Sequence, residues 1–183
     1  MNIQIISKKA KNLTPIEILI MNNSRIKLWE KDAKIDFKKE DSKGEFIFVK
    51  SNNKIKAFGM MKPIKIKLAK QKFTILGIGR GMAIEKRKGW GRILNAARIL
   101  KLKETKKTGI AFTSKQNIPF FEKVDYQIKK NGIRKFRYLN PKTKELISDP
   151  DEEMIYYEGK DKFVTKLLKS KELAITDTNF WQN

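Results

Sequence analysis

Residues 86–92 combine four basic side chains with two glycines, Gly89 and Gly91. Glycine lets backbone N–H groups approach an anion closely, and the periodicity of an amphipathic helix begins directly after Gly91. The first turn of such a helix presents free N–H groups and the positive end of its dipole. A strand, a basic glycine turn and a helix in this order favour a pyrophosphate site. The turn alone is weak evidence, because many strand-to-helix turns need glycine simply to bend.

The strand that leads into this turn has glycine at every second position, at Gly77, Gly79 and Gly81. On a regular strand these glycines share one face, which Ala83 continues, and apolar side chains line the other face. Repeated glycine weakens a strand, so it indicates a bulge or the close approach of another group. That group is either a tightly packed helix or an extended ligand arm that hydrogen-bonds to the exposed backbone.

The chain has a formal net charge of +22 at pH 7 and contains no cysteine or histidine. These absences exclude disulfides, thiolate nucleophiles and cysteine-based zinc sites and remove the commonest metal ligand, so we expect no metal. The charge favours nucleic acid, an anionic membrane or an anionic small molecule. Lysine greatly outnumbers arginine, however, and A+T-rich coding would also produce that excess. We find no apolar run long enough to span a bilayer and no signal-peptide pattern, so we expect a cytoplasmic location.

The expected elements predict a mixed α/β sheet and not a repeating parallel one. Strands are expected at residues 1–8, 45–50, 54–61, 72–84, 110–113 and 153–157. Thr14 and Glu17 predict a capping box at a helix start. The core-facing residues of this helix and of the helix after Gly91 are expected to be Ile16, Leu19, Ile20, Ile26, Leu28, Ile93, Ala97 and Leu100. Residues 51–53 and residues 131–132 predict hairpin turns, and the charged residues 62–70 predict an edge strand or a loop.

Further along the chain lies the segment Ile118-Pro119-Phe120-Phe121-Glu122-Lys123-Val124-Asp125-Tyr126. Together with the basic turn it resembles the GNAT acetyltransferase superfamily. Members carry Arg/Gln-x-x-Gly-x-Gly/Ala at the head of a helix, and later a segment close to Pro-Phe-Tyr-Glu-Lys-Leu-Gly-Phe. The first pattern appears here as Lys86-x-x-Gly89-x-Gly91. The resemblance covers about residues 45–126 and implies a single α/β domain with a mostly antiparallel central sheet flanked by helices.

The resemblance implies that acetyl-coenzyme A (acetyl-CoA) is the cofactor, and it gives particular residues a role. Backbone groups of Met82, Ala83 and Ile84 would pair with the pantetheine arm. The helix near Asn117 and Phe121 would close over the thioester end. The residues expected to hold the pyrophosphate are Lys86, Arg87, Lys88, Gly89, Trp90, Gly91 and Arg92.

The resemblance also implies a need for acid–base groups. An alkylamine has a pKa of about 10.4 and is mostly protonated at neutral pH, so acyl transfer to it needs a base. Glu85 is the carboxylate closest to the end of the strand and is the candidate, directly or through a water. The alternative is a solvated glutamate beside a basic turn. Phe121 occupies the position where many members have a tyrosine that protonates the leaving thiolate, so either water or Ser114 serves instead or activity is lost.

We therefore expect an N-acetyltransferase that moves an acetyl group from the CoA thioester to a primary amine by direct attack. Residues 1–158 would form the acyltransferase domain, and residues 159–183 a C-terminal helix and tail packed on it. The acceptor would be a small-molecule or protein amine; the sequence sets no oligomeric state, and a homodimer is one option. The alternatives are a catalytically weakened basic module that binds nucleic acid and an acetyltransferase that acts on tRNA or ribosomal components.

Overall fold

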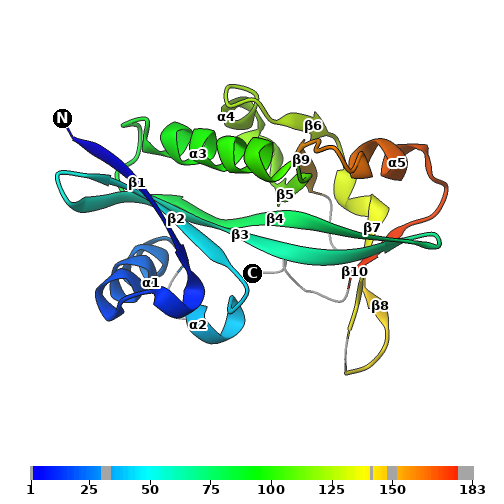
Figure 1. Cartoon of the computed structure of the whole chain (residues 1–183), viewed down its shortest axis with the longest axis horizontal. Helices are drawn as coiled ribbons and strands as arrows, with labels where there is room; N and C mark the ends of the chain where they lie inside the picture. The colour runs from blue at the N-terminus through cyan, green and yellow to red at the C-terminus, as the bar shows by residue number, and fades with distance from the viewer. Residues whose placement is uncertain (1, 30–33, 141, 148–151, 177–183) are drawn as a thin grey trace. The chain divides into compact units, whose positions relative to one another are not determined.

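The strands of this chain hydrogen-bond into one sheet (Figure 1). The computed structural model describes residues 2–29, 34–140, 142–147 and 152–176. Its ten strands are β1 (Ile3–Lys9), β2 (Glu45–Ser51), β3 (Lys54–Leu68), β4 (Gln71–Ala83), β5 (Gly109–Thr113), β6 (Gln127–Lys129), β7 (Phe136–Leu139), β8 (Leu146–Ile147), β9 (Glu153–Tyr157) and β10 (Ala174–Thr176).

The order of the strands is β6-β9-β5-β4-β3-β10-β7-β8, with β2 joined to β3 and β1 joined to β2. The pairs β4–β5 and β7–β10 are parallel. The pairs β1–β2, β2–β3, β3–β10, β5–β9, β6–β9 and β7–β8 are antiparallel. The predicted mixed, mostly antiparallel sheet flanked by helices is therefore confirmed.

The helices are α1 (Pro15–Trp29), α2 (Phe37–Glu40), α3 (Trp90–Thr105), α4 (Ile118–Phe121) and α5 (Phe163–Lys169). In the part of the chain that the structure describes, no helix has the length and apolar character needed to cross a membrane. The chain forms two compact units: unit 1 contains residues 1–62 and 80–97, and unit 2 contains residues 63–79 and 98–183. The boundary between the units runs through β3, β4 and α3, and the predicted boundary after residue 158 stays a prediction.

In unit 1, α1 and α2 lie on one face of β1–β3, and the first turns of α3 lie on the other face (Figure 1). The predicted capping box begins α1: the backbone N–H of Glu17 donates to Thr14 Oγ1 at 3.2 Å, and that of Thr14 donates to Glu17 Oε2 at 3.0 Å. Asn52 and Asn53 have φ values of +48° and +61° between β2 and β3. This left-handed pair is what a two-residue hairpin needs, so that predicted turn is also confirmed.

The face that α1 turns to the sheet differs from the predicted one. Ile16, Leu19 and Leu28 are 70%, 59% and 45% exposed. The buried residues of this helix are Glu17, Met21, Asn22 and Arg25. The Asn22 amide exchanges two hydrogen bonds with the backbone of Ile35, at 2.9 and 3.1 Å, and Glu17 forms an ion pair with Lys8 at 2.7 Å. The prediction from apolar periodicity was wrong because these partners, distant in the sequence, stabilise polar side chains on the inner face.

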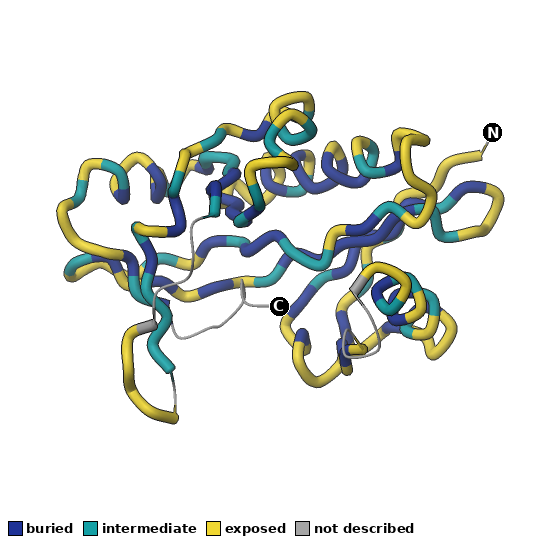
Figure 2. Tube along the Cα trace, turned by 180° about the vertical axis from the view of Figure 1, so that it is seen from behind, coloured by how far each residue is buried: buried dark blue, intermediate teal, exposed yellow. Residues whose placement is uncertain are grey.

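In unit 2, α5 packs on one face of the sheet. Phe163, Val164 and Leu167 of this helix join a buried cluster with Ile64, Ile66 and Leu68 of β3 and Ile75 of β4. Residues 62–70 were predicted as an edge or a loop, but residues 62–68 belong to β3, which lies between β4 and β10. The charge was misleading because Lys65 and Lys67 alternate with the buried residues and point to the other face. Figure 2 shows this mixture as dark blue stretches along the strands of the sheet, interrupted by exposed and half-buried residues.

The predicted hairpin at residues 131–132 was wrong, because β6 pairs with β9 whereas β7 pairs with β8 and β10. Asn131 does adopt the left-handed conformation that the turn signal predicts, with φ of +49°, but a 3-10 turn, Gly132–Lys135, follows it. Gly132 is needed there for packing, since a Cβ would lie 2.3 Å from the Cβ of Met154. Buried Glu153 accepts a hydrogen bond from the Asn131 N–H at 2.7 Å and holds this turn against β9.

Candidate functional site

The end of β4 has an edge that no described strand covers. β4 pairs with β5 at two positions, Leu76 with Gly109 and Gly77 with Ile110, although β4 is 13 residues long. By contrast, β5 pairs with β9 through all five of its residues. Beyond Gly77 the β5 side of β4 therefore has backbone groups that are not used in a described strand pair.

Arg80 interrupts the regular geometry of β4. Its φ of +52° is left-handed, a conformation that non-glycine residues adopt at bulges and other special sites. Gly77 is buried, Gly79 is half-buried and Gly81 is exposed, so the three glycines do not share one environment. The left-handed backbone at Arg80, between Gly79 and Gly81, is typical of a bulge, which was one of the two explanations that the pattern allowed.

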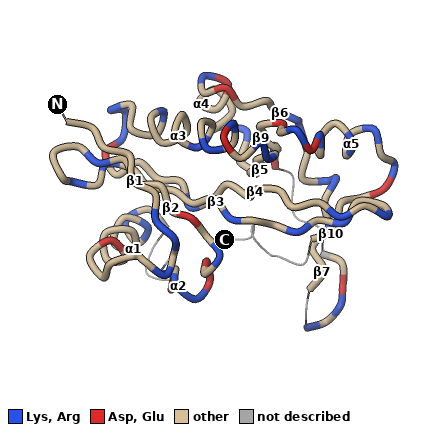
Figure 3. The backbone as a smooth tube through the Cα atoms, viewed as in Figure 1, with Lys and Arg blue, Asp and Glu red and all other residues tan. Residues whose placement is uncertain are grey.

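The basic turn lies between β4 and α3 in unit 1. Gly89 has φ of +80°, which favours glycine, and a Cβ built there meets no atom within 4 Å. The Gly89 carbonyl accepts the N–H groups of Arg92 and Ile93 at 2.9 and 3.2 Å and so begins α3. Lys86, Arg87, Lys88 and Arg92 are all exposed, and Figure 3 shows this concentration of blue before α3. The turn therefore offers an anion space, positive charge and the N-terminus of a 16-residue helix.

Glu85 stands beside this turn as half of an ion pair. Its carboxylate accepts a hydrogen bond from Lys56 Nζ, and its side chain is 45% exposed. The hydrogen bond and charge of Lys56 lower the pKa of Glu85 below its usual value. The buried indole N–H of Trp90 lowers the pKa of Glu85 by a smaller amount. This N–H makes no hydrogen bond of ordinary geometry with any described residue. A lower pKa makes Glu85 a weaker base than a free glutamate.

Unit 2 holds the other predicted residues at the end of β5 and on α4. The Asn117 amide donates to Thr113 Oγ1 at 3.0 Å and to Ser114 Oγ at 3.3 Å. Phe121 is half-buried, and its ring packs edge-on against Tyr126 with the centroids 5.8 Å apart. Ser114, Asn117 and Phe121 therefore form one local group, whereas Met82, Ala83, Ile84 and residues 85–92 form another in unit 1.

Arg98 of α3 was not singled out from the sequence. It is 3% exposed, and its Nη2 donates to the carbonyl of Gly79 at 2.7 Å, directly before the bulge at Arg80. Burial lowers the pKa of Arg98. Burial also raises the pKa of Tyr126 to about 12, and the charge of Arg98 opposes that rise. The signal that would have identified Arg98 is an arginine at one of the buried positions of α3. The predicted buried face of this helix was partly wrong, since Leu100, expected to be buried, is 58% exposed.

A second buried polar group lies in unit 1 around Asp41, which was also missed. Asp41 Oδ2 pairs with Arg80 Nε at 3.1 Å, and Asp41 Oδ1 lies 3.4 Å from Lys62 Nζ. The Asp41 side chain is 3% exposed, so both ion pairs lie largely out of water. Burial lowers the pKa of Arg25 on α1, and the nearby charge of Arg80 lowers it further. These contacts fix the side chain of the residue that forms the bulge.

Among the described residues, no three or more acidic side chains lie together in a group that could hold a metal ion. No protein-family model and no curated protein matches the sequence.

Solved structures do match the fold. The GNAT family N-acetyltransferase YhbS from Escherichia coli, solved in complex with CoA, aligns with a TM-score of 0.61 over 95% of this chain and 89% of its own, at 12% identity. ElaA from Escherichia coli aligns with a TM-score of 0.57 over 86% of this chain and 100% of its own, at 11% identity. The PaiA N-acetyltransferase from Thermoplasma acidophilum, in complex with coenzyme A, aligns with a TM-score of 0.54 over 86% of this chain and 99% of its own, at 12% identity.

Proposed function

We infer that this chain, which has the fold of the GNAT N-acetyltransferases, is an enzyme that binds acetyl-CoA and transfers its acetyl group to a primary amine. The observation that carries this inference is the turn at Gly89. Its positive φ, the open space around its Cα, its four exposed cations and the helix N-terminus all favour a bound pyrophosphate.

The cofactor would be held by backbone groups more than by side chains. N–H groups of residues 87–91 would bind the pyrophosphate, and the cations of the turn, Arg92 among them, would add attraction, because the N–H of Arg92 itself already donates to the Gly89 carbonyl. Backbone groups of Met82, Ala83 and Ile84 would bind the pantetheine arm, and Asn117 and Phe121 would lie near its thioester end. Bound in this way, acetyl-CoA supplies an acyl group activated as a thioester. The bulge at Arg80, held by Arg98 on the preceding carbonyl and by Asp41 on its side chain, gives β4 a fixed shape for this role.

Acyl transfer also needs proton transfers. The neutral amine attacks the thioester carbonyl, an N–H of the strand stabilises the oxyanion, and collapse forms the amide and releases the thiolate. Glu85 would accept the proton of the amine, directly or through a water, although the hydrogen bond and charge of Lys56 lower its pKa and make it a weaker base than a free glutamate. Ser114 or water would protonate the thiolate in place of the tyrosine that Phe121 replaces. The ion pair with Lys56 predicts that Lys56→Met raises the pKa of Glu85 and shifts the acidic limb of the pH–rate profile upward, whereas Glu85→Gln removes that limb.

Calorimetric titration with acetyl-CoA tests the cofactor directly. Binding to the wild type is expected, and Gly89→Asp should weaken it strongly because a carboxylate would repel the phosphate. Gly89→Asn is the matched control, since asparagine has the same shape, tolerates a left-handed backbone and carries no charge. It should retain clearly more affinity than Gly89→Asp. Absence of binding at millimolar acetyl-CoA, or equal affinity of the aspartate and asparagine variants, would contradict the proposed site.

The acceptor is open to a direct screen. Polyamines, aminoglycosides and peptides with free N-termini are incubated with acetyl-CoA, and mass spectrometry detects the added acetyl group. Acetylation of one of these amine classes, lost in Glu85→Gln, is the expected outcome. Binding of acetyl-CoA without transfer to any amine would instead support a protein that keeps the cofactor site and has lost catalysis.

A further inference from the structure

One face of the sheet in unit 2 is basic and has no described helix packed on it. The buried cluster beneath α5 contains Ile64, Ile66, Leu68 and Ile75 on one face of β3 and β4, and partly buried Phe73 packs against it. Side chains alternate along a strand, so Lys65 and Lys67 of β3 and Lys72 and Thr74 of β4 point to the opposite face, and all four are exposed.

The strand register extends this face across two further strands. Lys67 pairs with Ile175 of β10, and Ile175 pairs with Arg137 of β7. Both Ile175 and Arg137 are half-buried, and Arg137 Nη1 donates to the carbonyls of Arg134 and Phe136 at 3.1 and 2.7 Å. We name the six residues of this surface the basic face: Lys65, Lys67, Lys72, Thr74, Arg137 and Ile175.

The basic face has positive charge without acidic residues among it. The strands β3, β4, β7 and β10 contain no aspartate or glutamate, although the chain has 20 such residues. Four of the six residues of the basic face are cations, which gives this one surface a formal charge of +4. The separation of charge therefore indicates an attraction for anions at this surface.

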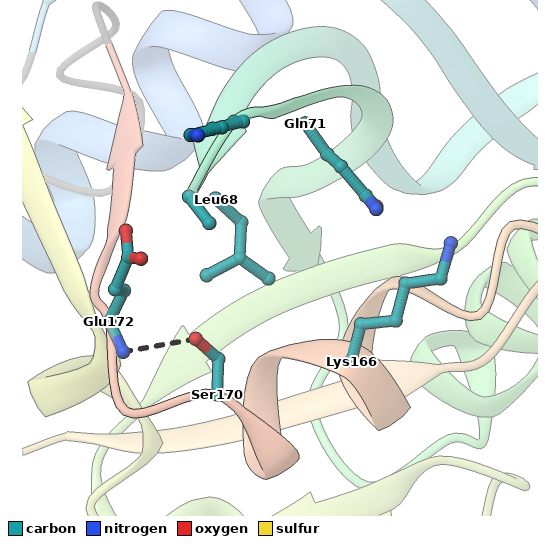
Figure 4. A pocket seen from close by; sticks show the side chains of 7 residues that line it. Leu68, Gln71, Lys166, Ser170 and Glu172 are labelled. Carbon is teal, nitrogen blue, oxygen red and sulfur yellow. Dashed lines mark hydrogen bonds between the residues drawn. The ribbon is translucent and has the colours of Figure 1, made fainter.

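A groove on the other side of the β3–β4 turn is a weaker candidate for an anion. It has a volume of about 430 Å³ and is lined by residues 68–71 and by Lys166, Ser170 and Glu172. Figure 4 shows the carboxylate of Glu172 at this groove, with its backbone N–H bonded to Ser170 Oγ. Lys166 already lies over the ring of Phe73, with Nζ 5.0 Å from the centroid. A carboxylate and an engaged lysine make the groove less favourable for an anion than the basic face.

We propose that the basic face binds the phosphate backbone of single-stranded nucleic acid. Lys65 and Lys67, two residues apart on one strand, have side chains about 7 Å apart, and neighbouring strands lie about 4.8 Å apart. Such rows of cations can follow the phosphates of an extended strand. The surface is a sheet face and not a protruding helix, so it does not suit the major groove of a duplex. Its one long apolar side chain, Ile175, is half-buried and its other members include four cations, whereas an interfacial membrane site would use a broad exposed apolar surface.

The same composition predicts how binding behaves. Without an aromatic side chain on which bases could stack, the basic face reads no sequence, and affinity comes from phosphate contacts. Binding should weaken steeply with salt, with each phosphate contact contributing about −0.7 to the slope of log K against log salt concentration. This inference is independent of the proposed acyl transfer, because the residues of the basic face are not among those assigned to acetyl-CoA.

The test is fluorescence anisotropy with a labelled 20-nucleotide uridine RNA over a range of salt concentrations. The triple variant Lys65→Glu/Lys67→Glu/Lys72→Glu should bind at least tenfold more weakly than the wild type. The triple variant Lys103→Glu/Lys107→Glu/Lys160→Glu is the control, because it changes the net charge equally at exposed lysines elsewhere in unit 2. It should lose less than threefold. Neutralising Lys65, Lys67 and Lys72 to glutamine should make the salt slope shallower by about 2.

If the glutamate variant fails to fold, which circular dichroism would reveal, the glutamine variant still tests whether Lys65, Lys67 and Lys72 bind RNA. Equal losses in the basic-face and control variants would overturn the proposal, because total charge alone would then explain binding. Absence of RNA binding by the wild type at low salt would also overturn it. A wild type that binds phosphatidylserine vesicles through the basic face but does not bind RNA would overturn it as well. Titration of the basic-face variant with acetyl-CoA should match the wild type, which separates this result from failure of the acyltransferase proposal.

Discussion

Gly89 and Gly159 are both required as glycine, but for opposite reasons. At Gly89 in unit 1 a Cβ meets nothing within 4 Å, and the left-handed φ of +80° is what favours glycine. At Gly159 in unit 2 a Cβ would lie 2.3 Å from the backbone carbon of Lys107 and 2.5 Å from the N atom of Thr108. The first glycine shapes an open turn, and the second lets two backbone segments touch. Space around a glycine, more than glycine itself, therefore distinguishes a candidate ligand site from a packing contact.

The largest expected effect is at Gly159. Gly159→Ala should lower the free energy of unfolding by about 3 kcal/mol, because the clashing atoms are backbone and cannot move aside as a flexible side chain would. Urea denaturation followed by circular dichroism measures this change. A loss no larger than that of Gly89→Ala would remove the contrast between the two glycines.

Thr108 is the next largest. It is fully buried, and its Oγ1 accepts the N–H of Gly159 at 3.0 Å and donates to Asp161 Oδ1. Thr108→Val keeps the shape but leaves the buried N–H of Gly159 and the half-buried carboxylate of Asp161 without this hydroxyl, so the free energy of unfolding should fall by about 2 kcal/mol. Thr74→Val, at an exposed position of β4, is the control and should change the free energy of unfolding little. Equal changes in both variants would show that the hydrogen bonds of Thr108 to Gly159 and Asp161 do not stabilise the fold.

Tyr126 gives the interior of unit 2 a pH signature. Its pKa is raised to about 12 by burial, so it stays neutral when folded while the unfolded chain ionises from about pH 10. Because the pKa is higher in the folded state, the contribution of the neutral Tyr126 side chain to the free energy of unfolding is fully present below pH 10 and is lost as the pH rises through about 12. From pH 9 to pH 11 the wild type should lose about 1.4 kcal/mol more than Tyr126→Phe. Parallel curves of unfolding free energy against pH would contradict this.

The smallest expected effect on stability is at the open turn. Gly89→Ala should lower the free energy of unfolding by about 1 kcal/mol, because only the left-handed backbone, and no clash, opposes the new methyl group. Gly89→Ala should lose a larger fraction of its affinity for acetyl-CoA than of its free energy of unfolding. A loss of stability above that of Gly159→Ala would mean that the turn packs against atoms that its open surroundings do not indicate.

The sequence predicts most elements because their signals are local. The capping box at Thr14, the turn at Asn52 and Asn53 and the strand-to-helix turn at Gly89 depend on residues a few positions apart. The inner face of α1 could not be predicted, since Asn22 and Glu17 are stabilised there by Ile35 and Lys8, which only the fold brings near. The hairpin at residue 131 failed for the same reason, because β9 and not β7 pairs with β6.

The candidate site divides in the same way. The turn proposed to bind an anion could be predicted from the sequence, because its glycines and cations lie close together along the chain. The bulge at Arg80, the hydrogen bond from Arg98 to Gly79 and the ion pair with Asp41 depend on contacts of 19 and 39 residues' separation. The assignments of Glu85 and Ser114 stay predictions, and the ion pair of Glu85 with Lys56 is a condition that sequence could not supply.

The outward-facing isoleucine and leucine of α1 have a consequence for handling the protein. Ile16 and Leu19 lie one helical turn apart in solvent on a molecule of net charge +22. At low ionic strength, mutual repulsion keeps such molecules apart, whereas at about 0.1 M salt the repulsion is screened beyond about 10 Å. Screening leaves the attraction between apolar side chains in place, and sulfate strengthens it. The second virial coefficient should therefore change from positive to negative as salt is added, and Leu19→Gln should move that crossing to a higher concentration.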